Sequence, residues 1–279
     1  MSFIAIIGAG ATGGAIAHKA AVRDRVGEIR LIDDAESIAR GKALDIVQSA
    51  PLDGFGARVT AASDLGAAAG AAIVIVADAA DGRGEHRGEA GLALIRTLSR
   101  LEQQAPILFA GAAQRELMAR AVSELHLDPA RLLGTAPLAL ESGLRAIAGL
   151  MADASGVEVS LRVVGVPPAD AVVAWEEASV FGQPLSAHLA AHEISGLTQR
   201  IPGLWPPGPY ALASAAVRVA EAATTGSRRR FSCFVALGRG AVVALPVEVG
   251  ERGANRILEP SLTRQERTRL ENAIESGRF

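Results

Sequence analysis

The stretch FIAIIGAGATGGAIAHKA, residues 3–20, decides the fold. An apolar run typical of a β-strand leads into Gly8, Gly10 and Gly13, spaced as G-x-G-x-x-G, and an alanine-rich segment typical of a helix follows. In such a unit the first glycine makes a tight turn, the second lets the backbone approach a diphosphate, and the third lets the helix pack closely on the strand. The N–H groups that open the helix then face the phosphates. The pattern therefore predicts a dinucleotide-binding turn.

A second signal follows at the end of the next predicted strand, EIRLID, residues 28–33. It closes on Asp33, about 20 residues after the last glycine of the pattern, where a carboxylate binds both hydroxyls of a ribose. The same carboxylate repels a 2′-phosphate, and no arginine follows immediately to receive one. NAD is therefore expected in preference to NADP. The predicted cofactor-binding residues are Gly8, Gly10, Ala11, Thr12, Gly13 and Asp33.

The first half of the chain alternates apolar strands with helical segments, which indicates parallel strands joined by right-handed crossovers. The second half contains antiparallel strand signals between helices, including a hairpin whose strands RRFSCFVAL and AVVALPVEVG are joined by GRG. We expect an α/β fold in which a Rossmann dinucleotide-binding domain with a parallel sheet, residues 1–138, precedes an α+β domain with antiparallel strands, residues 139–279. The chain is predicted to end in an amphipathic helix over TRQERTRLENAIES.

Composition excludes several classes of function. The 279 residues include 28 Lys and Arg against 30 Asp and Glu, so the chain has no basic excess with which to bind nucleic acid or an anionic membrane. No apolar run approaches the roughly 18 residues that a membrane span needs. The single cysteine, Cys233, lies inside the apolar run FSCFVAL, as expected of a buried, reduced side chain. These features predict a cytoplasmic protein that binds a small molecule.

Together these segments resemble the malate/lactate dehydrogenase family. The stretch IRLIDDAESIARGKALDIVQSAP is similar to the second strand and following helix of that family. The loop after VIVAD resembles its mobile substrate loop, and AVVALPVEVGERGANRILEPSLTRQER resembles its last hairpin and helix. The resemblance covers essentially the whole chain. It implies binding of NAD and of a small 2-keto or 2-hydroxy acid, and assembly as a homodimer or homotetramer through helices near residues 37–49 and 210–223.

The resemblance breaks at the positions that carry the family's chemistry. Arg87 matches the arginine that polarises the substrate carbonyl, while Asp81 falls at or near the position of a second loop arginine. The family's catalytic histidine is matched by Pro167, which can neither accept nor donate a proton. Three further family positions, an aspartate, a substrate-binding arginine and an Asn-Pro pair, are matched by Glu141, Leu144 and Gly111-Ala112.

Two other titratable groups are candidates for the missing acid and base. His86 neighbours Arg87 in the predicted loop, and loop closure would carry it toward a substrate. Glu141, next to an apolar cleft, would have a raised pKa and act as a base. His188 and His192 are four residues apart on a predicted helix over residues 187–199, a spacing that permits metal binding, but no third ligand accompanies them and no metal site is predicted.

Two functions remain open. The first is an NAD-dependent oxidoreductase that acts on an altered 2-keto or 2-hydroxy acid through Arg87 with Glu141 or His86. The second is a pseudoenzyme that binds NAD(H) and has a regulatory or partner-binding role. In both, ordinary malate or lactate turnover is predicted to be absent or very weak, because loss of a proton carrier alone lowers turnover by a factor on the order of 10⁴.

Overall fold

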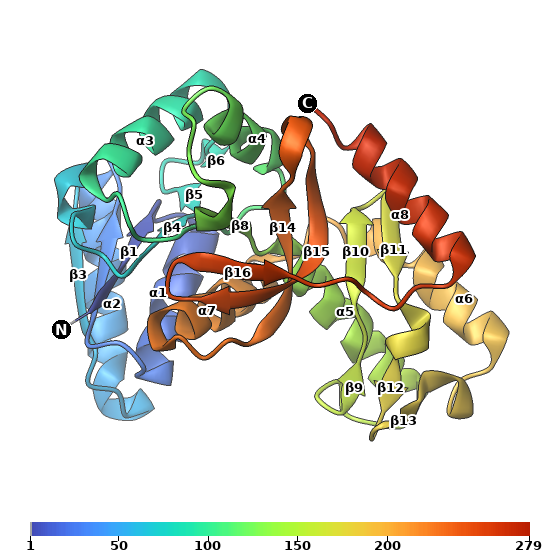
Figure 1. Cartoon of the computed structure of the whole chain (residues 1–279). Coiled ribbons are helices and arrows are strands. Elements are labelled where there is room, and N and C mark those ends of the chain that lie inside the picture. Colours follow the sequence, from blue (N-terminus) through green and yellow to red (C-terminus); the bar gives the residue numbers. More distant parts are fainter. Residues whose placement is uncertain (1) are drawn as a thin grey trace.

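The computed structural model describes residues 2–279 (Figure 1). In the first half, apolar strands alternate with helices as the sequence predicts, and Gly8 lies immediately after the first strand. The strands are β1 (Phe3–Ile7), β2 (Glu28–Ile32), β3 (Arg58–Ala62), β4 (Ile73–Val76), β5 (Asp78–Ala79), β6 (Gly84–Glu85), β7 (Ile107–Phe109) and β8 (Leu132–Gly134). The helices are α1 (Ala11–Arg23), α2 (Glu36–Asp53), α3 (Gly88–Leu101) and α4 (Arg115–Ser123).

The second half mixes short antiparallel strands with helices. Its strands are β9 (Val159–Ser160), β10 (Val163–Val166), β11 (Asp170–Val173), β12 (Ser179–Val180), β13 (Gln183–Pro184), β14 (Arg230–Ala236), β15 (Val242–Gly250) and β16 (Gly253–Ile257). Its helices are α5 (Ala136–Met151), α6 (Ala191–Gln199), α7 (Pro209–Thr225) and α8 (Arg264–Ser276). The predicted hairpin is β14 and β15, and the predicted terminal helix is α8, which Thr263 and Glu266 open with a capping box. The α/β fold class is confirmed.

One sheet joins the two halves. Its order is β11-β10-β15-β14-β8-β7-β4-β1-β2-β3, with β16 paired to β15. The pairs from β3 to β8 are parallel, and β14 then pairs antiparallel with β8, where Phe234 lies opposite Gly134. The sheet therefore runs across residue 138, and the domain boundary near that residue stays a prediction.

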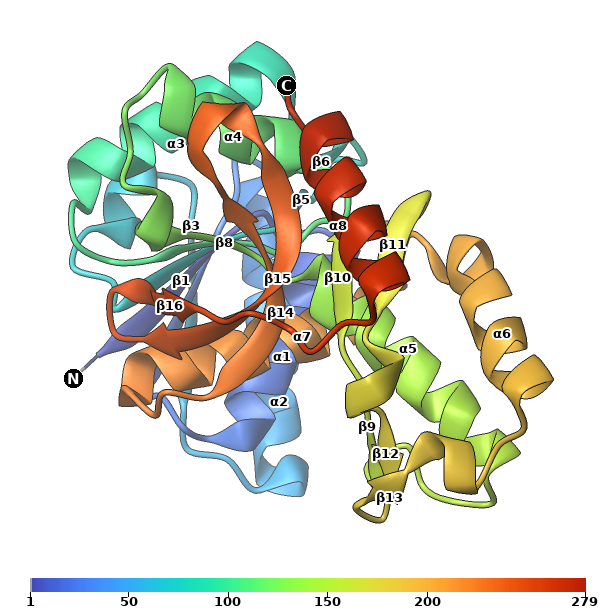
Figure 2. The same cartoon turned by 45° about the vertical axis from the view of Figure 1, so that its right-hand side comes forward.

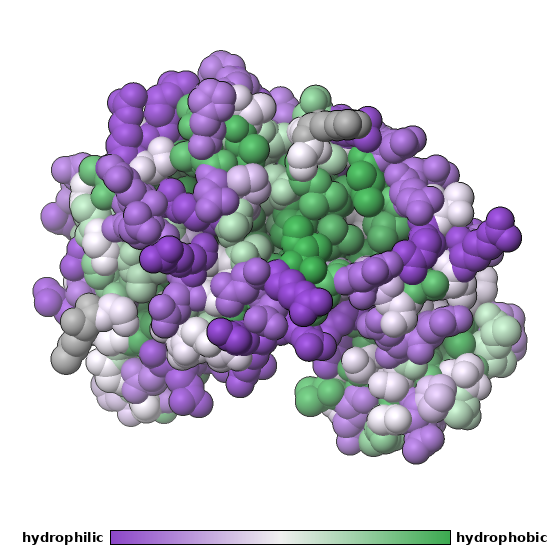
Figure 3. Space-filling view, in the orientation of Figure 1, coloured by the Kyte–Doolittle hydropathy of each residue, from purple (hydrophilic) through white to green (hydrophobic). Residues whose placement is uncertain are grey.

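Apolar side chains fill both faces of this sheet. One core includes buried residues of α1, α2 and α7, and another includes buried residues of α3 and α4. A third core lies among α5, α6, β9 and β12 and contains Leu140 and Leu144. These four elements form the lobe beside the main sheet that is seen from two directions in Figures 1 and 2. On the face seen in Figure 3, hydrophobic residues gather in a hollow over β15 and β10 beside α8.

Two arginines tie the halves together. Arg23 of α1 donates two hydrogen bonds to the carboxylate of Glu221 on α7, one of them 2.8 Å long. Arg115 at the start of α4 donates to the carbonyl oxygens of Val242 on β15 and Gly277 after α8, at 2.8 and 3.2 Å. The end of α1 and the start of α4 are thereby fixed against the second half of the chain.

Helix boundaries bear on function in two places. Helix α1 begins at Ala11, directly after Gly10, so that Thr12 and Gly13 stand in its first turn. The predicted helix over residues 187–199 is wrong at its start, because α6 begins at Ala191 and leaves His188 at the end of a separate 3₁₀ turn. Within residues 2–279, none of the helices is both long and apolar enough to cross a membrane.

The third glycine of the turn tests how closely α1 approaches β1. A Cβ atom on Gly13 would lie 2.0 Å from the carbonyl oxygen of Gly8, whereas a Cβ on Gly41, inside α2, meets nothing within 4 Å. We expect Gly13→Ala to lower the free energy of unfolding by more than 1 kcal/mol, as overpacking does. The matched Gly41→Ala should raise it by about 0.5–1 kcal/mol, as alanine does in a helix interior. Chemical denaturation measures both, and equal stability of the two variants would contradict the close approach.

Candidate functional site

The glycine turn between β1 and α1 packs against the end of β4. Gly8 adopts φ +103°, a conformation that side chains disfavour, and a Cβ there would lie 2.4 Å from the carbonyl oxygen of Asp78. The backbone N–H of Gly10 donates to that same carbonyl oxygen at 2.8 Å. Gly8, Gly10 and Gly13 therefore form the compact turn that the sequence predicts, and Asp78 lies directly against it.

The carboxylate of Asp78 occupies the start of α1. It accepts hydrogen bonds from the backbone N–H groups of Gly13 at 2.9 Å and of Thr12 at 3.2 Å. Gly10, at the N-cap position, has no side chain with which to cap the helix. A Cβ on Gly10 would lie 2.4 Å from the Asp78 carboxyl group. Asp78 thus supplies from another strand the anion that the first turn of a helix attracts.

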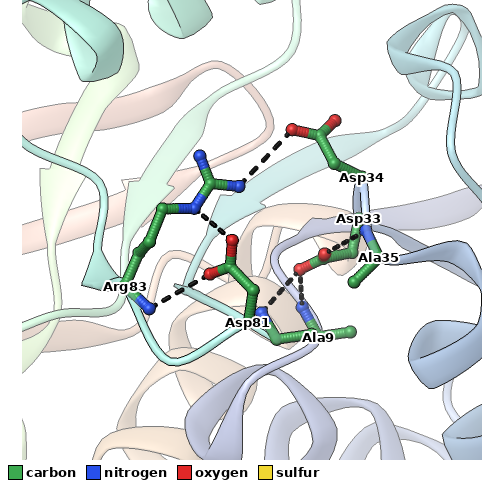
Figure 4. A network of polar contacts seen from close by, with 7 residues as sticks. Ala9, Asp33, Asp34, Ala35, Asp81 and Arg83 are labelled. Atoms are coloured by element: carbon green, nitrogen blue, oxygen red, sulfur yellow. Dashed lines mark hydrogen bonds and ion pairs between the residues drawn. The ribbon is translucent and has the colours of Figure 1, made fainter.

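Asp33 is buried at the end of β2, and three backbone groups donate to it. Its carboxylate accepts hydrogen bonds from the N–H groups of Ala9 at 2.8 Å, Ala35 at 2.9 Å and Ala80 at 2.9 Å (Figure 4). The carboxylate therefore joins the glycine turn to the loop after β4. Asp33 lies beside the glycine turn, and its binding of a ribose stays a prediction.

A cavity of about 290 Å³ opens beside Gly8 and Asp33. Arg83 lies at its edge, where its guanidinium contacts Asp81 and lies 3.6 Å from Asp34 (Figure 4). His86 also lines the cavity, and its Nε2 atom is buried without a hydrogen-bond partner. Burial lowers the pKa of His86 below its ordinary value, so the imidazole is neutral at pH 7. The structure places His86 beside the glycine turn.

The segment after β4 folds as a small two-stranded ribbon, β5 and β6, in which Asp78 and Glu85 are direct partners. The Glu85 carboxylate accepts hydrogen bonds from the N–H groups of Ala112 and Ala113, both at 2.9 Å. A Cβ on Gly111 would lie 2.4 Å from the Glu85 carboxyl carbon, so this carboxylate fills the space that a larger residue at 111 would use. Two carboxylates thus hold the ribbon: Asp78 binds the start of α1, and Glu85 binds the loop before α4.

Arg87 is the N-cap residue of α3, two residues after the ribbon ends at Glu85. Its side chain is 63% exposed, and its guanidinium lies 3.9 Å from Glu85. The predicted loop residues Arg87 and His86 are therefore neighbours of the ribbon, and Arg87 faces a carboxylate of the protein itself.

Pro167 lies in the turn between β10 and β11 and is buried. The turn leaves Gly165 at φ +86°, where a Cβ would lie 2.3 Å from the carbonyl oxygen of Asp170. The two prolines, Pro167 and Pro168, thus form a hairpin turn and contribute no titratable group. Pro167 itself is packed in this turn, and its match to the family's histidine stays a prediction.

Glu141 lies at the opposite end of β10. Its carboxyl group accepts a 2.5 Å hydrogen bond from the Ser232 hydroxyl and a 3.4 Å bond from the N–H of Val163, the first residue of that strand. Val163 and Pro167 are four positions apart along the extended chain, which corresponds to about 13 Å at the usual rise. The structure therefore does not bring Glu141 to Pro167. Glu141 lines a cavity of about 690 Å³, which Arg145 and Arg162 also line.

Among residues 2–279 no three His, Cys, Asp or Glu side chains gather as a metal site would require. His188 and His192 stand on different elements, as described above, so the shared helix that would permit a joint metal site is absent from this region. Cys233 is confirmed as a buried free thiol. Burial raises its pKa well above its ordinary value, which keeps the sulfur protonated.

Asp78 and Glu85 are site residues that the sequence reasoning missed. The only signal for Asp78 is its position directly after the apolar run IVIVA, where the carboxyl ends of parallel strands meet. The signal for Glu85 is weaker, because it falls in a charged, glycine-rich loop in which no periodicity selects one carboxylate.

Comparison with known proteins agrees with this architecture. The malate dehydrogenase of Salinibacter ruber superposes with a TM-score of 0.88 at 22% identity, over 99% of this chain and 96% of that one. A lactate dehydrogenase of Cryptosporidium parvum in complex with lactic acid and NAD gives 0.87 at 24% identity, over 99% and 95%. The malate dehydrogenase of Aeropyrum pernix gives 0.86 at 20% identity, over 98% and 96%.

The chain therefore has the fold of the malate and lactate dehydrogenases across its whole length. No protein-family model matches it. This level of identity establishes the shared architecture alone.

The buried Glu141 gives a test that depends on pH. Burial raises the pKa of its carboxyl group, and the Ser232 hydroxyl opposes this shift. Because the pKa is higher in the folded than in the unfolded chain, the folded state gains stability below the ordinary glutamate pKa, and this gain is lost as pH rises through the raised pKa. We expect Glu141→Gln to have the same unfolding free energy as the wild type at low pH. The variant should lack the decline in unfolding free energy that the wild type shows as pH rises through the raised pKa of Glu141. Denaturation from pH 4 to 8 measures this, and parallel profiles would contradict it.

Proposed function

We propose that the chain binds NAD(H) at the glycine turn and that ordinary malate or lactate turnover is absent or very weak. The carrying observation is the combination of the turn at Gly8 to Gly13 with the Asp33 carboxylate, both beside a cavity of about 290 Å³. Asp33 already accepts three backbone N–H groups, and a carboxylate has about four acceptor positions. One position therefore remains for a ribose hydroxyl, and a 2′-phosphate would be repelled. These features support NAD over NADP.

The adenosine half of the cofactor fits the residues present better than the diphosphate half does. Leu65 and Leu94, both partly exposed, provide apolar surface in the cavity beside Asp33, as an adenine ring requires. The N–H groups of Thr12 and Gly13, where a diphosphate would be expected, already bind Asp78. When bound, NAD(H) supplies a hydride donor or acceptor, and the protein must supply the groups that move the proton and hold the substrate.

The site lacks well-placed groups to move the proton and hold the substrate. Pro167 carries no proton, Glu141 lies at the other end of β10, and Glu85 fills the space beside Gly111. This arrangement favours a protein that binds the cofactor without the family's usual reaction, as a pseudoenzyme with a regulatory or partner-binding role. The second candidate is hydride transfer to an altered 2-keto or 2-hydroxy acid, favoured by the exposed Arg87 and the unpartnered Nε2 atom of His86.

We also propose that the chain pairs with copies of itself, as a homodimer or homotetramer. Helix α2 presents Leu44, Val47 and Leu52 to solvent with exposed fractions of 58%, 42% and 91%, and Tyr210 at the start of α7 is 82% exposed. Apolar side chains exposed on neighbouring helices are typical of an interface. A mass equal to one chain in light scattering would contradict the pairing.

Cofactor binding is tested by thermal unfolding with NADH and with NADPH. A ligand that binds only the folded state raises the melting temperature with concentration. We expect a concentration-dependent rise with NADH and a smaller one with NADPH, because Asp33 repels the 2′-phosphate. No rise with either cofactor, even at millimolar concentration, would refute the proposal.

Turnover is tested with NADH and a panel of 2-keto acids that includes oxaloacetate and pyruvate. For these two substrates we expect kcat/KM lower by a factor on the order of 10⁴ or more than in ordinary dehydrogenases. Pro167→His should not restore it, because Glu141 is not placed to orient the new imidazole and Glu85 remains at Gly111. Turnover of either acid within a hundredfold of ordinary dehydrogenases would be incompatible with the proposal. Reduction of another acid in the panel would select the second candidate.

A further inference from the structure

We infer that Asp78 controls the affinity of the chain for dinucleotides, because its carboxylate occupies the backbone groups that a diphosphate needs. The inference rests on the proposed NAD(H) binding and specifies which residue limits it. A dinucleotide must displace this carboxylate before its diphosphate reaches the first turn of α1.

The space above Gly10 is already occupied by a group of the protein. The second glycine of such a turn permits close approach of a diphosphate to the backbone. In this chain the group that makes the close approach is the Asp78 carboxyl, which would lie 2.4 Å from a Cβ on Gly10. The absence of a side chain at Gly10 is therefore already used by the protein. The same carboxylate accepts the N–H groups of Thr12 and Gly13.

The negative charge of Asp78 also opposes a diphosphate at the start of α1. The first turn of α1 contains no acidic residue of its own, so Asp78 is the anion that interacts with the positive end of the helix. A diphosphate placed there with Asp78 still present would meet a like charge and would lack the two N–H donors. Lys42 lies at the same turn, where its Nζ atom donates to the carbonyl oxygen of Gly10 at 2.6 Å. Its charge attracts a diphosphate, but it does not replace the two N–H donors that Asp78 occupies.

The backbone around Asp78 holds it in place. The β5–β6 ribbon pairs Asp78 with Glu85, and the Glu85 carboxylate is fixed by the N–H groups of Ala112 and Ala113. On the other side, the carbonyl oxygen of Asp78 accepts the N–H of Gly10. The carboxylate is therefore positioned by two strands and a turn, and it is ready to bind α1 before any ligand arrives.

The test measures binding of three ligands by isothermal titration calorimetry at fixed ionic strength. Adenosine lacks a diphosphate, ADP-ribose contains one, and NADH adds the nicotinamide. The variants are Asp78→Gly, which removes the side chain, and Asp78→Asn, which removes only its charge. The matched control is Asp128→Asn, because the exposed Asp128 also accepts a backbone N–H, from Ala130, and lies in the turn before β8. Circular dichroism verifies that each variant is folded.

We expect both Asp78 variants to bind ADP-ribose and NADH at least tenfold more tightly than the wild type and Asp128→Asn, which corresponds to about 1.4 kcal/mol. Adenosine affinity should not change between wild type and variants. Equal NADH affinity in the wild type and both folded Asp78 variants would overturn the inference and leave NAD(H) binding intact. If none of the three ligands binds any folded protein, the proposed function fails and the inference fails with it.

Discussion

The contact between the Asp78 carboxylate and the first turn of α1 is the interaction on which the site depends. The opening N–H groups of a helix have no partner within the helix and attract an anion. In a dinucleotide-binding protein that anion is the cofactor's diphosphate. Here Asp78 accepts from Thr12 and Gly13 and at the same time fills the space above Gly10. The features that make the turn suitable for a cofactor are thus the ones that bind a side chain of the protein.

A second carboxylate follows the same principle. Asp33 accepts three backbone N–H groups and joins the glycine turn to the loop after β4, so it stabilises the fold as well as lining the 290 Å³ cavity. Glu85 accepts two more at the loop before α4. Backbone N–H groups at strand ends and helix starts must find acceptors. In this chain acidic side chains accept hydrogen bonds from these N–H groups, and fewer N–H donors therefore remain for an anionic ligand.

Local patterns in the sequence were sufficient for most of the fold. The glycine spacing, the alternation of strands and helices, the β14–β15 hairpin and the capped α8 depend on neighbouring residues, and the structure confirms them. The role of Asp78 could not be found in this way, because the bond to Thr12 joins positions 66 residues apart. The orientation of Glu141 could not be predicted for a related reason. Its acidic character was visible, but which end of β10 it faces depends on how α5 packs on that strand, and the structure pairs it with Ser232.

We propose that the dinucleotide and Asp78 compete for the same two backbone N–H groups, those of Thr12 and Gly13. The most direct measurement is a crystal structure of the chain with NADH bound. We predict that diphosphate oxygens accept from the N–H groups of Thr12 and Gly13 and that the Asp78 carboxylate has moved away from both. NADH bound with Asp78 still on these two groups, or bound away from Gly8 and Asp33, would contradict the account.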